Sequence, residues 1–160
     1  MDPYDTQAVR AVWERVRLSH EQLLASMIAR EQQDRDFYRR IARQAGPMGK
    51  RLLSIATEEE KHLQQLRELY NSLYGALPST EPPMQVRYRN LRQALEAQRE
   101  KELADAQSYS KAANHYTAYA ELFLALSNEE KSHGAILSDL LDGRKSMGQR
   151  NNFPHNRQRR

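Results

Sequence analysis

The sequence predicts an all-α protein built as a four-helix bundle. Apolar residues recur at intervals of three and four, and no window alternates with the period of two that marks a half-buried strand. The chain of 160 residues contains only six glycines and six prolines, too few for a turn-rich β protein. Hydrophobic residues make up 39% and charged residues 29%, a balance that suits long helices with one buried stripe.

The first expected element is a short helix near residues 6–17. Its apolar stripe, which is expected to pack against the bundle, consists of Val9, Val12, Trp13 and Val16. Ser19 and Gln22 have the spacing of a capping box, which predicts that a new helix starts there. Because of this break, we expect an N-terminal extension over residues 1–19. The alternative is one continuous helix over 6–45.

Four longer helices are expected to form the bundle over residues 20–143. The apolar period places them at 20–45, 48–74, 86–113 and 116–142. The breaks between them are Gly46-Pro47, the proline-rich stretch 75–83 and Asn114-His115. Gly143 is expected to end the last helix.

The lengths of the links predict the order of the helices. The first and third links are tight, so each joins two antiparallel helices into a hairpin. The middle link, residues 75–85, can reach about 35–40 Å when extended. That approaches the length of helix 48–74 at about 1.5 Å per residue. The sequence thus predicts one long crossover, which makes the second and third helices parallel.

Composition excludes several classes of function. The chain has no cysteine, which excludes disulfides, thiolate metal sites and a cysteine nucleophile. No apolar run approaches the length of a membrane span, and the first residues lack the apolar core of a signal peptide, so a cytoplasmic protein is expected. The net charge of +4 comes from the predicted tail, residues 144–160, which carries six basic residues and no acidic one.

The basic tail allows two interpretations. It is either a flexible solubilising end or an anchor for an acidic partner such as nucleic acid, a membrane surface or another subunit. We favour the solubilising end, so binding of nucleic acid or membrane is not expected.

Two Glu-x-x-His motifs are the strongest chemical signal. Glu59 and His62 lie on the second bundle helix, and Glu130 and His133 on the fourth. A spacing of three places both side chains on one helix face, close enough to bind one metal ion.

A repeat of 71 residues connects the two motifs with further residues. The offset relates Glu31 to Glu102, Glu59 to Glu130 and His62 to His133. It also relates Asp34 to Asp105 and Tyr38 to Tyr109. Because each hairpin has similar numbers of residues on either side of its turn, both of its glutamates are expected at one level. The sequence therefore predicts a helical hairpin that occurs twice, with two carboxylates and one imidazole in each copy.

Metal binding would make this arrangement tolerable. Four carboxylates that converge in an apolar bundle repel one another, and burying them without partners is costly. Two divalent cations balance the charge of four glutamates and two neutral histidines. Oxygen and imidazole donors suit iron or manganese, and zinc is possible. In this prediction Glu59 and Glu130 bridge two ions, Glu31 and His62 complete one, and Glu102 and His133 complete the other.

The sequence resembles the ferritin-like superfamily of dinuclear-metal carboxylate proteins, and within it the rubrerythrin or erythrin branch. The phrases EQQDRDFY and EEEKH in the first half, and ELADAQSY and NEEKSH in the second, resemble the helix pairs of that branch. The likeness covers about residues 20–142. It implies a ferritin-like bundle that holds two iron ions, with manganese possible, and that reduces peroxide or oxidises Fe(II). It also implies H2O2, O2 or Fe(II) as substrate, and a homodimer by analogy.

The sequence departs from rubrerythrins in two places. Rubrerythrins proper carry a rubredoxin module with a four-cysteine iron site, whereas this chain has no cysteine, so an external electron donor is implied. They also use an additional glutamate three residues after the ligand of the third helix, where this chain has Asp105. Asp34, Asp105, Tyr38 and Tyr109 are candidates for an additional ligand or for support of the ligands.

Two alternatives to the oxidoreductase stay open at this point. One is a bundle that binds iron or manganese without turnover. The other is a bundle that protects nucleic acid, with the tail as its binding element.

Overall fold

A computed structural model describes residues 7–79 and 86–150, and every regular element within these ranges is helical. The helices are α1 (Gln7–Ala42), α2 (Gly49–Tyr74), α3 (Leu91–His115) and α4 (Ala120–Arg150). Short 3-10 turns precede α2 and α4. The prediction of an all-α protein with four main helices is confirmed for this part of the chain.

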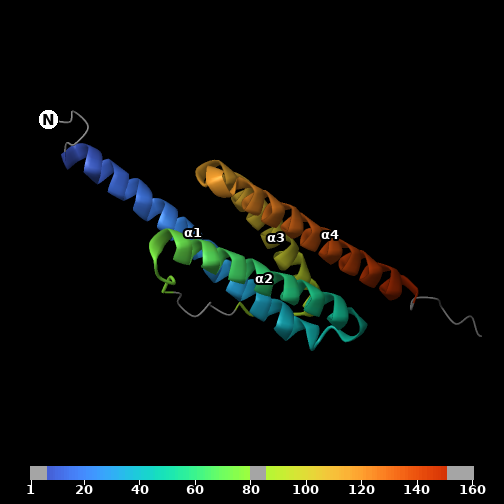
Figure 1. Cartoon of the computed structure of the whole chain (residues 1–160). Coiled ribbons are helices and arrows are strands. Elements are labelled where there is room, and N and C mark those ends of the chain that lie inside the picture. The colour runs from blue at the N-terminus through green and yellow to red at the C-terminus, as the bar shows by residue number, and fades with distance from the viewer. Residues whose placement is uncertain (1–6, 80–85, 151–160) are drawn as a thin grey trace, which may run out of the picture. The chain divides into compact units, whose positions relative to one another are not determined.

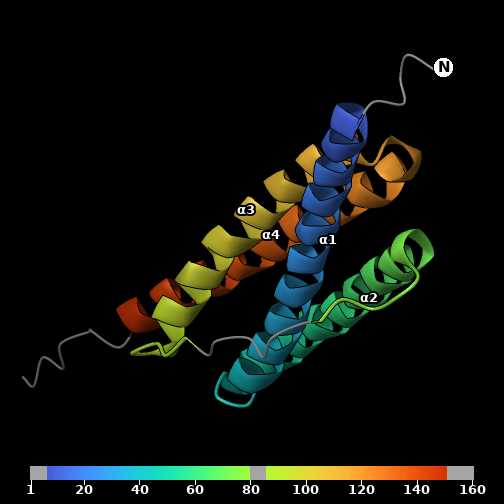
Figure 2. The same cartoon turned by 90° about the vertical axis from the view of Figure 1, so that its left-hand side faces the viewer.

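The chain divides into two compact units, residues 1–86 and 87–160, and each contains one helical hairpin. Both views show α1 beside α2 in the first unit and α3 beside α4 in the second (Figures 1 and 2). Each pair is joined by a short turn, as the lengths of the links predict.

The first hairpin turns at Gly46, whose φ of 54° lies in the left-handed region that glycine adopts without steric cost. Its two helices then meet closely, because a Cβ atom on Gly49 would lie 2.5 Å from the carbonyl oxygen of Ala42. Across the hairpin, Arg35 and Arg39 both contact Glu60, at 3.1 and 3.2 Å. The apolar core of this unit includes the fully buried side chains of Leu24, Ile28, Leu52, Leu63 and Leu66.

A buried tyrosine also connects α2 to α1. The hydroxyl of Tyr70 donates a hydrogen bond to the Glu21 carboxylate at 2.8 Å. Burial and this bond to Glu21 together raise the pKa of Tyr70. Because its folded pKa is raised, the folded state holds the hydroxyl proton more tightly than the unfolded state does.

We expect Tyr70→Phe to lower the free energy of unfolding by about 1 kcal/mol at neutral pH, since it removes one hydrogen bond. The raised pKa makes this contribution complete below the unfolded tyrosine value of about 10, and the contribution is lost as the pH rises through the folded value. Urea unfolding at pH 7 and above pH 10 measures both effects. Tyr74→Phe is the control, with an expected change within about 0.5 kcal/mol. A Tyr70→Phe protein whose free energy of unfolding at pH 7 equals that of the wild type would contradict the expectation.

The second hairpin begins at a well-formed helix cap. The Asn90 side chain accepts a hydrogen bond from the Gln93 amide at 2.9 Å, and the Gln93 side chain accepts one from the Arg89 amide at 2.8 Å. This reciprocal pair starts α3 at Leu91, so the expected start at residue 86 was too early. Further along, the Ser127 hydroxyl donates to the Ala106 carbonyl at 2.7 Å and ties α4 to α3.

The predicted break near Ser19 is wrong, because α1 is one helix from Gln7 to Ala42. The Ser19 hydroxyl donates to the Val16 carbonyl at 2.8 Å, which is a bond made within a helix rather than at its start. No glycine or proline occurs between residues 4 and 45, so nothing forces the backbone out of the helix. The N-terminal turns of α1 extend past the end of α2 (Figures 1 and 2), and Trp13 is 69% exposed rather than packed.

The predicted stop at Gly143 is also wrong, because α4 continues to Arg150. A glycine ends a helix when it adopts positive φ, and among the described glycines only Gly46 and Gly75 do so. Residues 144–150 of the predicted tail are therefore helical, and 151–160 lie outside the described residues.

The predicted crossover falls partly outside the described residues, since its residues 80–85 are not among them. The parallel order of the second and third helices stays a prediction. Within the described ranges, no helix is both long and apolar enough to cross a lipid bilayer.

Candidate metal centre

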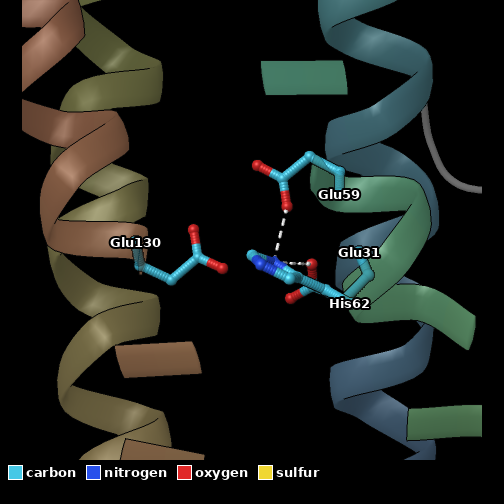
Figure 3. A group of neighbouring side chains, drawn as sticks. All are labelled: Glu31, Glu59, His62 and Glu130. Atoms are coloured by element: carbon cyan, nitrogen blue, oxygen red, sulfur yellow. Dashed lines mark ion pairs between the residues drawn. The ribbon is translucent and has the colours of Figure 1, made fainter. Parts of the chain in front are cut away.

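The first hairpin brings together Glu31 from α1 and Glu59 and His62 from α2. All three side chains are buried, and each offers a ligand atom within 4.8 Å of the others. The Nδ1 atom of His62 lies 3.3 Å from Oε2 of Glu31 and 3.2 Å from Oε2 of Glu59. Figure 3 draws these side chains, with the imidazole beside both carboxylates. We call Glu31, Glu59 and His62 the first triad.

The second hairpin carries the equivalent set, the second triad of Glu102 from α3 and Glu130 and His133 from α4. These side chains are also buried, with ligand atoms within 4.8 Å of one another. The Nδ1 atom of His133 lies 3.2 Å from Oε2 of Glu130 and 3.8 Å from Oε2 of Glu102. In both triads the same ring nitrogen faces the carboxylates.

Helix geometry explains why the triads form. Within α2 and α4, the spacing of three places the glutamate and the histidine on one face. In the first hairpin that face is turned toward α1, since Nδ1 of His62 on α2 lies 3.3 Å from Oε2 of Glu31 on α1. The first glutamate of each triad then meets the motif across the hairpin. No residue of either triad lies on the surface.

The triads suit a divalent metal ion. Two carboxylates and an imidazole withdrawn from water lose solvation, and the two like charges repel. A cation held among them would offset both costs, and the mixed oxygen and nitrogen donors fit iron, manganese or zinc. The six residues predicted as ligands are thus arranged as two donor sets, one in each hairpin, and their role as ligands stays a prediction.

The four additional candidates are buried as well. Asp105 forms an ion pair with Lys101 at 2.7 Å on α3, so its carboxylate contacts an ammonium group. Asp34 is buried at the equivalent place on α1. Tyr38 and Tyr109 are fully buried and contact neighbouring rings, Phe37 at 5.4 Å and Phe123 at 6.2 Å between ring centroids. These contacts show that both tyrosines pack in the core.

Sequence reasoning missed two side chains near the second triad. Gln98 donates a hydrogen bond from Nε2 to Oε1 of Glu102 at 2.7 Å, and Lys101 binds Asp105. Both lie four residues before their partner on α3. That spacing is visible in the sequence as a pair of neighbours on one helix face, but many such pairs occur in so polar a chain.

The remaining histidines do not join the triads. His115 is exposed and His20 is half-buried, while His155 lies outside the described residues.

Comparison with known proteins gives one family match. A family model described as Rubrerythrin matches residues 22–141, which is most of the chain and includes both triads. A search of curated proteins found no match.

Proposed function

This chain belongs to the rubrerythrin family, whose domain is a ferritin-like bundle, and we propose that it is a dinuclear-metal oxidoreductase that reduces peroxide. The observation that carries the proposal is the pair of buried triads, each with two carboxylates and one imidazole within 4.8 Å. Iron is the proposed metal, with manganese as the other candidate.

The charges of the six side chains support two ions rather than one. Four glutamates with two neutral histidines carry four negative charges, which two divalent cations balance. We propose that Glu31 and His62 hold one ion, that Glu102 and His133 hold the other, and that Glu59 and Glu130 bridge them. The proposed pairing of the two triads rests on the family and on the 71-residue offset.

The proposed reaction takes two electrons. With two Fe(II) ions held by these residues, the site would supply two electrons, which together with two protons reduce H2O2 to two water molecules. The six side chains of the two triads would balance the positive charge of the ions and fix the positions of the donor atoms. Because all six are buried, they also keep bulk water away. These 160 residues contain no cysteine for a thiolate iron site, so a separate electron donor is proposed.

The test begins with the metal content of protein purified without added metal. The iron-loaded chain is then reduced without oxygen and mixed with H2O2 in amounts below the iron content. We expect two Fe(II) oxidised for each H2O2, and the same yield after a second reduction. Replacing H2O2 with O2 and excess Fe(II) separates a peroxidase from a ferroxidase.

The same experiment addresses metal binding without turnover. In that case the chain binds iron, but H2O2 does not oxidise it quickly or does so only once. Either result would contradict the proposed oxidoreductase and favour a role in holding iron.

A further inference from the structure

Gln98 is a buried amide in direct contact with a predicted metal ligand. Its side chain is only 3% exposed, and Nε2 donates to Oε1 of Glu102 at 2.7 Å. The two residues lie four apart on α3, so one helix face carries both. A hydrogen bond to a carboxylate is stronger than one between neutral groups. The amide therefore holds the Glu102 carboxylate in one orientation.

In this orientation the two carboxylate oxygens of Glu102 face different partners. Oε1 accepts the hydrogen bond from Gln98, whereas Oε2 faces the imidazole of His133, with 3.8 Å to its Nδ1. Oε2 is thus directed toward the other donors of the second triad. In metal sites, partners of this kind orient the ligands before the ion arrives.

The first hairpin has a different side chain at the equivalent position. The offset of 71 that relates Glu31 to Glu102 relates Met27 to Gln98. Met27 is fully buried, and its thioether has no N–H or O–H group to donate. The two triads therefore contain the same ligand types but differ in the residue one turn before the first glutamate.

We propose that Gln98 is a positioning residue that makes the two metal subsites inequivalent, so that the second triad binds the first ion. This inference rests on the proposed metal centre. Gln98 fixes Glu102 for binding through Oε2, and Met27 cannot do the same for Glu31. Loss of such a partner typically weakens metal binding by about 10–100-fold.

The test is a titration of the metal-free chain of 160 residues with Mn²⁺, followed by calorimetry, and with Co²⁺, followed by its visible absorption. Wild-type protein is expected to bind two ions in two steps of different Kd. Gln98→Met, which makes the second hairpin like the first, should raise the Kd of the tighter step by about 10–100-fold. The reverse change, Met27→Gln, should lower the Kd of the weaker step.

Histidine variants identify the subsite that Gln98 affects. In a His62→Ala background, where the second triad stays complete, Gln98→Met should still weaken binding. In a His133→Ala background, where only the first triad stays complete, the same change should leave the Kd unaltered. A general effect of Gln98 on folding would weaken binding in both backgrounds and lower the thermal midpoint.

Several results would overturn the inference. They are a wild-type titration with two equal steps, a Gln98→Met titration like that of wild type, and an effect confined to the His133→Ala background. If Gln98→Met does not fold, the inference is tested by the Met27→Gln titration alone. In that titration, a Kd of the weaker step equal to that of the wild type contradicts the inference. A chain that binds no metal would overturn the proposed function as well, whereas two ions bound without any effect of Gln98 would overturn this inference only.

Discussion

Glu59→Gln and Glu130→Gln are each expected to remove peroxide turnover while leaving part of the metal bound. Both residues are proposed as bridges, so a neutral amide in either place should uncouple the two proposed ions and leave their positive charges less well balanced. Reduction of a peroxide needs two electrons, which one intact iron ion cannot supply. Glu31→Gln and Glu102→Gln each change a residue that is proposed to bind one ion only, and water could replace that ligand. These two variants should keep part of the activity.

The measurement is peroxide consumption by the iron-loaded wild type and the four variants with a supplied reductant, with metal content determined in parallel. Glu129→Gln is the matched control, because Glu129 adjoins Glu130 on α4 but is exposed. It should consume peroxide at the wild-type rate. Wild-type activity in Glu59→Gln would exclude the dinuclear mechanism, whatever the metal content.

Metal binding is expected to stabilise the fold strongly. The metal-free chain keeps buried carboxylates close together in each triad, and the cation removes this repulsion in the folded state only. With Fe²⁺ or Mn²⁺ at about 100 times Kd, the free energy of unfolding should rise by about 2.7 kcal/mol. For a chain of this length the thermal midpoint should rise by about 5–10 °C.

Thermal unfolding with and without metal, followed by circular dichroism, measures this shift. His62→Ala should reduce the shift, because it removes a donor of the first triad. His115→Ala is the matched control, since His115 is exposed on α3 and should leave the shift unchanged. A chelator should reverse the effect. If no divalent ion raises the midpoint, the triads do not bind metal.

The helices were predictable because their signals are local and repeated. The apolar period runs through every helix, and Gly46 and Asn114-His115 mark the two hairpin turns in the sequence itself. The single-residue signals were weaker. Ser19 and Gly143 have the identity of a cap and a stop, but each acts as one only where the backbone leaves the helical region. Their neighbours continue the helix, and the local signal is overridden.

The two triads could be predicted for a related reason. The Glu-x-x-His spacing fixes two side chains on one helix face, and the number of residues around each turn fixes the level of the facing glutamate. Simple counting therefore placed Glu31 opposite Glu59, and Glu102 opposite Glu130. The family match over residues 22–141 includes both triads but does not test the roles of their residues.

The order of the amino acids is enough to predict that the chain is helical, that it has two hairpins, and which carboxylates and imidazoles can meet in each. These properties follow from helix periodicity and from distances along the chain. The neighbours that contact those side chains become known only from the packing of the folded chain. The bond from Gln98 to Glu102 and the ion pair of Lys101 with Asp105 depend on side-chain rotamers. Rotamers are set by the packing of the facing helix, and spacing along one helix does not encode that packing.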